Sequence, residues 1–345
     1  MSYPTAFEPS DMTNVFAIRL LRKSAANLAV PFRGSRIVVL LEKRNEVGNM
    51  TFLGHLVTGL SLGAIYAIIA LGYTMVYGIA KMLNFAHGDV IMVGAFVCFT
   101  IVSSLELPPV LGIILAMILC TALGIIIERL AYKPLRQAPS LAVLITAIGV
   151  SYLLQNGAQL IWGASPKSFP AMFSFGGEKG ITLFGGQLNI SYVAIITVSV
   201  CIVIMIALTL FTEKTRIGKA MRACSEDKAA AQLMGVNVNQ TISVTFAIGS
   251  ALAAVAGVLM CSAYPALSPT TGSLPGIKAF TAAVFGGIGS IPGALLGGVL
   301  LGLIETFTKA YITTDLSDAI VFAVLIVVLL VKPSGLLGKY VLEKV

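Results

Sequence analysis

The chain has 345 residues, of which 57% are hydrophobic and 11% charged, and its formal net charge is +8. Soluble domains carry roughly 25% charged residues, so this composition, with a mean hydropathy of +0.94, excludes an ordinary soluble fold and predicts an integral membrane protein with many spans. The apolar runs lack the alternating pattern of a membrane β-barrel, so helical spans are expected. Because the basic residues are spread over loops that flank the spans, the net charge does not indicate nucleic-acid binding.

The first 49 residues differ from the rest of the chain. They hold seven basic and four acidic residues and no apolar run of span length, and they lack the hydrophobic segment of a signal peptide. We expect residues 1–49 to be a disordered extension or the result of a mis-assigned start ahead of Met50, with a basic segment on the membrane surface as the alternative. The first predicted span, Phe52–Ile79, carries Gly59 and Gly63 at a spacing that lets another helix approach closely.

Polar residues open the second predicted span. Asn84 is placed as a helix N-cap, and His87, Gly88 and Asp89 follow in the first turns. A histidine or aspartate buried inside a membrane segment is costly and marks a functional site by default, whereas at the water interface the cost largely disappears. The residues leave two roles open, which are capping of the helix and a place on a transport pathway or partner surface.

A polar stripe runs along the fourth predicted span, Leu141–Trp162. Ser151, Gln155 and Gln159 recur every four residues and therefore share one helix face. In a bilayer such a face contacts other helices or a water-filled path rather than lipid. Hydrogen bonding between helices and lining of a pathway both fit the pattern.

Two loops rich in lysine and arginine fix the orientation of the chain. Residues 128–140 carry Arg129, Lys133 and Arg136, and residues 213–240 carry five basic and three acidic side chains between two apolar runs of span length. Short basic loops next to membrane spans are retained on the cytoplasmic side. Both loops are therefore predicted to be cytoplasmic.

The second of these loops contains a predicted short helix. Ser225 is placed as its N-cap, and two acidic residues follow near the positive end of the helix dipole. The next residues, AAAQLM, are good helix formers, and Gly235 stops the helix. A structured connector and a docking helix for a cytoplasmic partner are the two interpretations of this segment.

The last third of the chain holds a broken apolar run. Residues 277–307 are long enough for one span, but Gly286, Gly287, Gly289 and a following proline interrupt them, so two short helices joined by a tight turn are expected. The basic tail after Lys332 then returns to the cytoplasm, in agreement with the positive-inside rule. A single crossing would leave the tail outside.

The sequence shows no recognisable catalytic or cofactor site. It has two histidines and no Ser/His/Asp, Cys/His or paired-carboxylate arrangement, and it lacks the phosphate-binding loop G-x-x-x-x-G-K-[ST]. Its five cysteines lie in or beside spans, without metal-ligand spacing. We therefore predict a protein that is not an enzyme and that holds no cofactor and no metal.

Several motifs, in a fixed order, are similar to those of one transporter family. Residues from about 50 to 340 resemble the permease subunit of branched-chain amino acid ABC importers, the LivH type. The segment AAAQLMG also resembles the EAA-x-x-x-G loop of ABC importer permeases, with Ala229 in place of the glutamate. The motifs that carry the resemblance are NFAHGD (84–89), PLRQAP (134–139), LITAIG (144–149), RIGKAMRACSEDKAAAQLMGV (216–236), GSALAAVAG (249–257), AAVFGGIGSIPGALLGG (282–298) and KPSGLLG (332–338).

The resemblance implies an assembly of several subunits in the bacterial inner membrane. Two permeases, usually this one and a paralogous partner, form the pathway, two cytoplasmic ABC ATPase subunits bind the inner loops, and an extracytoplasmic solute-binding protein delivers leucine, isoleucine or valine. The implied fold is an all-α polytopic bundle of about 8–10 transmembrane helices, similar to type II ABC importers. Residues 50–340 would form this bundle, with a cytoplasmic coupling loop at 213–240 and a cytoplasmic tail at 341–345.

The resemblance also assigns the candidate site residues to two groups. Those expected to couple the permease to its ATPase partners are Arg222, Ser225, Asp227, Ala230, Ala231, Met234 and Gly235. Those expected on the translocation pathway, or in helix packing, are Asn84, His87, Asp89, Ser151, Gln155, Gln159, Gly286, Gly287 and Gly289.

Other functions fit parts of the sequence. A urea or amide permease of the same family shares many of the motifs. An ion-coupled secondary transporter needs intramembrane carboxylates, for which Asp89 and Glu305 are the candidates, and it leaves the docking helix unexplained. A passive channel or a membrane scaffold fits the glycine-rich faces but not that helix.

Overall fold

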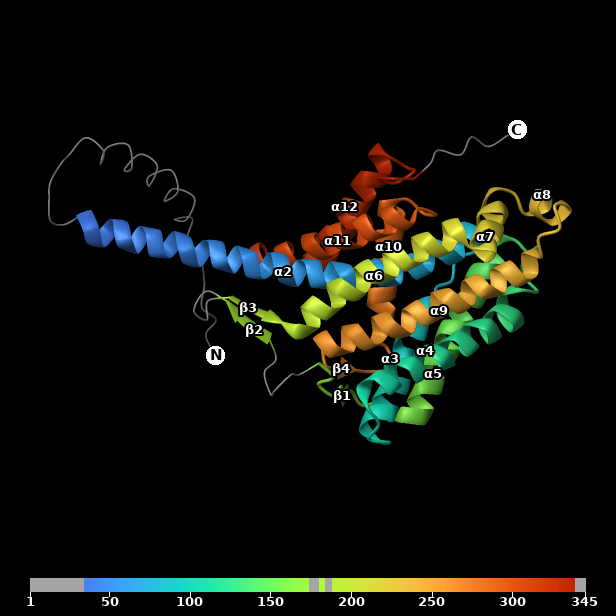
Figure 1. Cartoon of the computed structure of the whole chain (residues 1–345), viewed down its shortest axis with the longest axis horizontal. Coiled ribbons are helices and arrows are strands. Elements are labelled where there is room, and N and C mark those ends of the chain that lie inside the picture. Colours follow the sequence, from blue (N-terminus) through green and yellow to red (C-terminus); the bar gives the residue numbers. More distant parts are fainter. Residues whose placement is uncertain (1–33, 174–179, 184–187, 339–345) are drawn as a thin grey trace, which may run out of the picture. The chain divides into compact units, whose positions relative to one another are not determined.

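Helices dominate the computed structural model, which describes residues 34–173, 180–183 and 188–338 (Figure 1). The pattern of internal contacts divides the chain into two units, residues 1–51 and residues 52–345. The second unit is called the body. The helices are α2 (Gly34–Ala80), α3 (His87–Ser103), α4 (Pro109–Ile127), η1 (Glu128–Tyr132, a π-helix), α5 (Ser140–Trp162), α6 (Tyr192–Lys214), α7 (Arg216–Glu226), α8 (Lys228–Leu233), α9 (Val238–Ala263), α10 (Ser273–Gly286), α11 (Ile291–Tyr311) and α12 (Ser317–Val331).

Helix α2 runs through the expected boundary at residue 49. Residues 34–49 are helical where a disordered extension is expected, because they hold helix-favouring leucine, glutamate, lysine and arginine and no proline. The segment of α2 that is long and apolar enough to cross a membrane is Thr51–Ala80. The expectations for residues 1–33 and for the tail at 341–345 lie outside the described residues.

Eight apolar helices in the described part of the chain confirm a polytopic helical membrane protein. Two of them, α3 and α12, are shorter than the roughly 20 residues that cross a hydrocarbon core. The six of full span length are Thr51–Ala80, Pro109–Tyr132, Ser140–Trp162, Tyr192–Lys214, Val238–Ala263 and Ile291–Tyr311. These six are fewer than the about 8–10 transmembrane helices expected from the sequence, and α3 and α12 bring the number of apolar helices in the described residues to eight.

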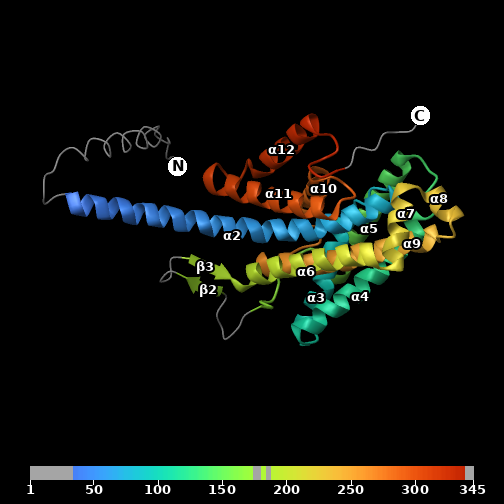
Figure 2. The ribbon, with the colours of Figure 1, turned by 45° about the horizontal axis from the view of Figure 1, so that its top comes forward.

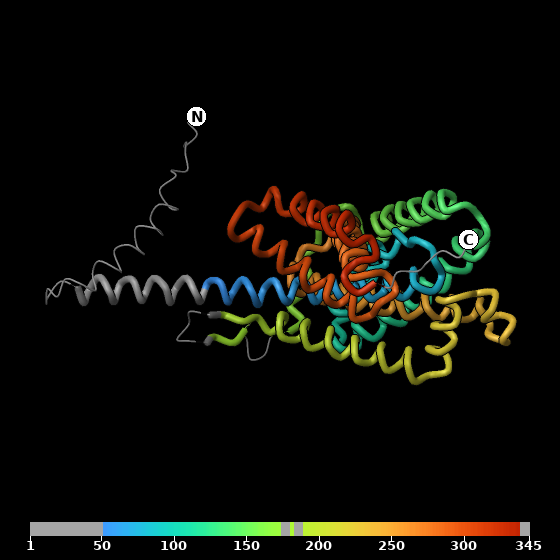
Figure 3. The backbone as a smooth tube through the Cα atoms, turned by 90° about the horizontal axis from the view of Figure 1, so that it is seen from above, coloured from blue at the N-terminus to red at the C-terminus, as the bar shows by residue number. Residues whose placement is uncertain are grey.

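Helices α2 and α9 form the interior of the body, and α4, α5 and α6 are largely exposed. In Figures 2 and 3, α2 lies between α11 and α12 on one side and α6 on the other. The expected close approach at the α2 glycines is confirmed, because a Cβ on Gly63 would lie 2.7 Å from the Cα of Val299 in α11. A Cβ on Gly59 would likewise lie 3.0 Å from the side chain of Leu303.

Two short antiparallel strand pairs lie at one end of the body, as seen in Figure 1. Strands β1 (Lys167–Ser168) and β4 (Ala266–Leu267) pair Lys167 with Leu267. Strands β2 (Gly180–Leu183) and β3 (Leu188–Ser191) pair Gly180 with Ser191. Helices α7 and α8 lie at the opposite end (Figure 1).

The predicted break in the last apolar run is confirmed, with different helix lengths. Helix α10 ends at Gly286, and Gly287 and Gly289 have φ values of +103° and +95°, which only glycine adopts readily. Helix α11 is not short, because its 21 residues continue to Tyr311. The break lies at the same end as the tail after α12, since the backbone N–H of Leu336 donates to the carbonyl of Phe285.

Candidate functional site

The predicted cytoplasmic helix corresponds to α8, and a second helix, α7, precedes it in the same loop with one residue between them. That residue, Asp227, caps α8, because its carboxylate accepts hydrogen bonds from the backbone N–H groups of Ala229 (2.8 Å) and Ala230 (3.0 Å). The prediction of Ser225 as the cap is wrong. Ser225 lies in the last turn of α7, where its hydroxyl donates to the carbonyl of Arg222 at 2.7 Å. A carboxylate is the better partner for the positive end of a helix dipole.

The predicted helix stop at Gly235 is confirmed. Its φ is +83°, its N–H donates to the carbonyl of Gln232 at 3.0 Å, and the N–H of Val236 donates to the carbonyl of Ala231 at 3.0 Å. These two bonds form the Schellman arrangement that ends many helices. No neighbouring atom lies within 4 Å of an added Cβ. A larger residue at position 235 would therefore meet no steric clash, and its cost would come only from the left-handed backbone conformation.

The exposed apolar face of α8 contains two of the three apolar residues expected to couple the permease to its ATPase partners. Ala230 and Met234 are exposed, but Ala231 is 4% exposed and faces the body. Leu233, absent from the prediction, is 89% exposed. The spacing 230, 233 and 234 is the i, i+3, i+4 pattern of one helix face, a signal that identifies Leu233 once the cap at Asp227 fixes the helix start.

Lys228, which was not among the predicted site residues, connects α8 to the interior of the body. Its Nζ donates to the carbonyl of Ala80, the last residue of α2, at 2.6 Å. The C-terminal end of a helix favours a cation. Partial burial lowers the pKa of Lys228, and the nearby charges of Arg136 and Lys81 lower it further. Helix α8 is therefore attached directly to a buried span.

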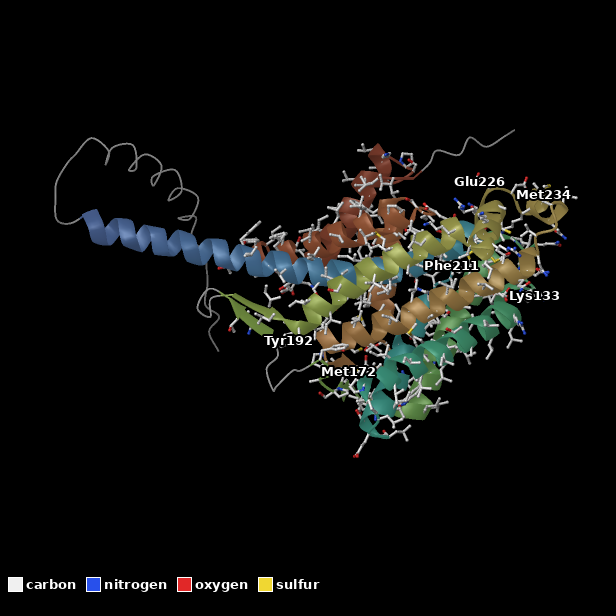
Figure 4. The ribbon with its side chains drawn as sticks, in the orientation of Figure 1. Lys133, Met172, Tyr192, Phe211, Glu226 and Met234 are labelled. Carbon is white, nitrogen blue, oxygen red and sulfur yellow. The ribbon has the colours of Figure 1, made fainter. Side chains whose placement is uncertain are left out.

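The two basic loops meet at one end of the body. Figure 4 shows Lys133, Glu226 and Met234 together at that end, with Met172 and Tyr192 at the other. Arg222 is exposed there, and its guanidinium donates to the carbonyl of Glu213 at 3.2 Å. This common location agrees with the prediction that both loops lie on one side of the membrane.

A second polar cluster surrounds Asp89, which is 2% exposed. The Nε2 of Gln155 in α5 lies 2.9 Å from Asp89 Oδ1 and 3.2 Å from the hydroxyl oxygens of Ser151 and Ser273. The cluster therefore joins α3, α5 and the start of α10. Gln159, predicted on the same stripe, is exposed and is not part of it.

His87 and Asn84 lie inside the body rather than at a water interface. The His87 side chain is buried, and its ring packs against that of Tyr73 with centroids 4.6 Å apart. Gly72 leaves the space for it, because a Cβ there would lie 2.6 Å from His87 Nε2. The prediction of Asn84 as the N-cap is wrong, since α3 begins at His87 and the Oδ1 of Asn84 accepts a hydrogen bond from the hydroxyl of Tyr132 at 2.8 Å.

The glycines of the α10–α11 break are separate from both clusters. A Cβ on Gly286 would collide with the carbonyl of Gly293 at 1.9 Å, and one on Gly287 would lie 2.3 Å from the backbone nitrogen of Gly338. Gly289 has open space around its Cβ position. The close contacts of Gly286 and Gly287 are with the neighbouring turn and the tail.

A buried ion network joins four helices and was not predicted. The Nζ of Lys278 in α10 lies 2.8 Å from Glu305 Oε1 in α11 and 2.6 Å from Asp318 Oδ1 in α12. Glu305 also accepts hydrogen bonds from Lys309 at 2.5 Å and from the hydroxyl of Tyr66 in α2 at 2.8 Å. Lys278 and Glu305 are 6% and 1% exposed, so their charges are compensated by each other rather than by water.

Among the buried carboxylates of the described residues, Asp89 differs from the others because it has no basic partner. Glu128 pairs with Arg136, and Glu305 pairs with Lys278 and Lys309. Asp89 has no basic group within ion-pair distance there, and only neutral donors contact its carboxylate. A buried carboxylate without a cation is a functional site by default.

A bundle of apolar spans that encloses polar clusters, with a short exposed helix pair at one end, defines a membrane protein of the permease class. The family described as branched-chain amino acid transport system / permease component matches residues 55–329, and the chain belongs to that family.

The relatives of the chain carry matching names. This chain is 45% identical over 307 residues to the high-affinity branched-chain amino acid transport system permease protein LivH of Salmonella typhimurium. The alignment covers 85% of this chain and 98% of the relative. The corresponding protein BraD of Pseudomonas aeruginosa is 46% identical over 302 residues, with the same coverage. A probable LivH of Methanocaldococcus jannaschii is 30% identical and covers 79% of this chain and 88% of the relative.

Proposed function

We propose that this chain is the membrane-spanning subunit of an ABC importer and forms the translocation pathway for branched-chain amino acids. The observation that carries the proposal is the family match over residues 55–329, which runs from α2 into α12. The relatives named above are permease proteins of branched-chain amino acid systems. The chain itself is not an enzyme in this proposal, and ATP hydrolysis belongs to its partner subunits.

The proposed partners occupy the two ends of the body. Two cytoplasmic ATPase subunits bind the end with α7 and α8, where Ala230, Leu233 and Met234 present an exposed apolar face beside basic side chains. An extracytoplasmic solute-binding protein meets the opposite end, which holds the strand pairs (Figure 1). A paralogous permease completes the pathway in the bacterial inner membrane.

The function is tested by transport in proteoliposomes that contain the complete complex. We expect ATP-dependent uptake of labelled leucine that needs the binding protein and is not competed by excess urea or acetamide. Uptake of urea in place of leucine would instead support an amide permease of the same family. Leucine uptake by this chain without ATPase subunits would overturn the importer proposal in favour of an ion-coupled transporter.

Within this function, we propose that the Asp89 cluster lies on the pathway and that Asp89 contacts the ammonium group of the amino acid. Asn84, His87, Ser151 and Gln155 would support this site. The carboxylate is held by neutral donors alone, so a cationic group would gain a charge-assisted hydrogen bond without displacing a resident cation. Gln159, which is exposed, would face the neighbouring permease.

Replacing Asp89 with asparagine should reduce leucine uptake by roughly tenfold to a hundredfold, since hydrogen bonds to charged groups contribute about 1.5–3 kcal/mol. The measurement is initial uptake rate, normalised to the amount of assembled complex. Asp315→Asn is the matched control, because Asp315 is exposed in an outer turn. Normal uptake by the Asp89→Asn variant would place Asp89 in helix packing instead.

A further inference from the structure

Two neighbouring cavities open at the end of the body that holds the basic loops. One, here called the η1–α9 cavity, has a volume of about 520 Å³ and lies between η1 and the start of α9. The other, of about 510 Å³, lies between the loop after η1 and the turn after α8, and the two share Asn237 and Asn239. The residues that line the η1–α9 cavity are Arg129, Lys133, Asn237, Asn239, Gln240 and Ser243.

The η1–α9 cavity carries positive charge that no carboxylate of the described residues neutralises. Arg129 and Lys133 lie four residues apart on one helix face, both are exposed, and neither has an acidic group within 4.0 Å in the described part of the chain. The nearest acidic side chain on the same helix, Glu128, is fully buried and already pairs with Arg136 and with the hydroxyl of Ser243. The cavity therefore favours an anion.

An exposed apolar ridge leads from the cavity along the membrane span. Residues Pro109–Tyr132, which comprise α4 and η1, form one of the spans. Ile126 and Leu130 are 51% and 76% exposed and lie on the same side of the helix as Arg129 and Lys133. The ridge continues toward the opposite end of the span through Leu111, Leu115, Ile118 and Leu119, all of them exposed.

We propose that this cavity binds the headgroup of an anionic phospholipid from the cytoplasmic leaflet, with an acyl chain along the α4 ridge. The lipid phosphate would contact Arg129 and Lys133, and the amide groups of Asn237, Asn239 and Gln240 supply neutral hydrogen-bond donors at the same cavity. Basic pockets between helices at the cytoplasmic side of a membrane recognise lipid headgroups in this way.

The apolar ridge distinguishes a lipid from a soluble anion or an acidic segment of a protein. A soluble phosphate or an acidic peptide would use the charges but would gain nothing from the exposed side chains between Leu111 and Leu130. The η1–α9 cavity also contains no residue of α8, so it is separate from the proposed ATPase contact at Leu233 and Met234. A lipid can occupy this cavity whichever solute the permease carries.

Lipid retention by the assembled complex tests the proposal. The complex is purified in detergent after equilibration with phosphatidylglycerol or phosphatidylcholine, and bound lipid is counted by native mass spectrometry. We expect the wild-type chain to retain phosphatidylglycerol selectively and R129Q/K133Q to retain it roughly tenfold to thirtyfold less, given the attraction of each basic residue to anionic lipid. The matched control is K214Q/K219Q, which removes two exposed charges that line neither cavity.

Three results would overturn the lipid site. The first is equal retention of phosphatidylglycerol by the wild-type chain and by R129Q/K133Q. The second is displacement of the lipid by inorganic phosphate at an equal concentration of phosphate groups, which would show a site for a soluble anion. The third is loss of the ATPase subunits from R129Q/K133Q while lipid retention is unchanged, which would assign the cavity to a protein partner.

Discussion

Replacing Lys278 with methionine is expected to destabilise the helical bundle by up to about 3–5 kcal/mol, because the buried Glu305 carboxylate then keeps only the partly exposed Lys309 as a cationic partner. Lys278 lies between Glu305 and Asp318 at 2.8 and 2.6 Å. The side chain of Asp318 is about half exposed, so water can solvate its carboxylate after Lys278 is removed. The side chain of Glu305 is 2% exposed, so water cannot solvate it in the same way. The measurement is the midpoint of unfolding in a denaturing detergent series.

Two further variants separate the buried charge from the loss of side-chain volume. In K278M/E305Q both buried charges are absent, and we expect at least half of the lost stability to return, since neutral replacements of a whole buried pair cost little. Lys309→Met should cost about 0–1 kcal/mol, because the Lys309 side chain is 42% exposed. If K278M and K309M lower the midpoint equally, the network is not a buried ion pair in energetic terms.

The network also shows what the sequence could and could not predict. Hydropathy predicts the spans because each span must satisfy its backbone hydrogen bonds internally, so its composition alone identifies it. The break after Gly286 and the stop at Gly235 were predictable for a similar local reason, since φ values of +103° at Gly287 and +83° at Gly235 favour glycine.

Contacts between distant segments were not predictable in this way. Lys278 was one of several polar residues near a glycine-rich run, and its partners are 27 and 40 positions away. The acceptor of Lys228 is 148 positions away, and Tyr132 reaches Asn84 across 48 positions. Each pairing depends on how the helices cross, for which one sequence carries no signal. The prediction of Ser225 as the N-cap of α8 was wrong for a different reason. Serine and aspartate are both good N-caps, so the sequence alone did not distinguish Ser225 from Asp227.

Replacing Gly235 with valine is expected to uncouple ATP hydrolysis from transport while the permease still folds. A β-branched residue with a φ of +83° carries a strain of roughly 1–2 kcal/mol. Helix α8 has six residues, and helices of this length are not stable by themselves in water. Its order depends on the Asp227 cap, the Gly235 stop and the contact of Lys228 with α2. Loss of the stop should disorder the exposed face at Leu233 and Met234.

The measurement is leucine uptake, ATPase activity and copurification of the ATPase subunits, each compared with wild type. We expect uptake to fall roughly fivefold to thirtyfold, in line with a strain of about 1–2 kcal/mol, with weakened association or with ATP turnover that no longer drives uptake. Gly235→Asn is the control, because asparagine tolerates the left-handed region. It should retain most of the uptake, since no neighbouring atom obstructs its Cβ. Normal uptake and association in the valine variant would show that α8 is a connector and that coupling depends on another part of the cytoplasmic end.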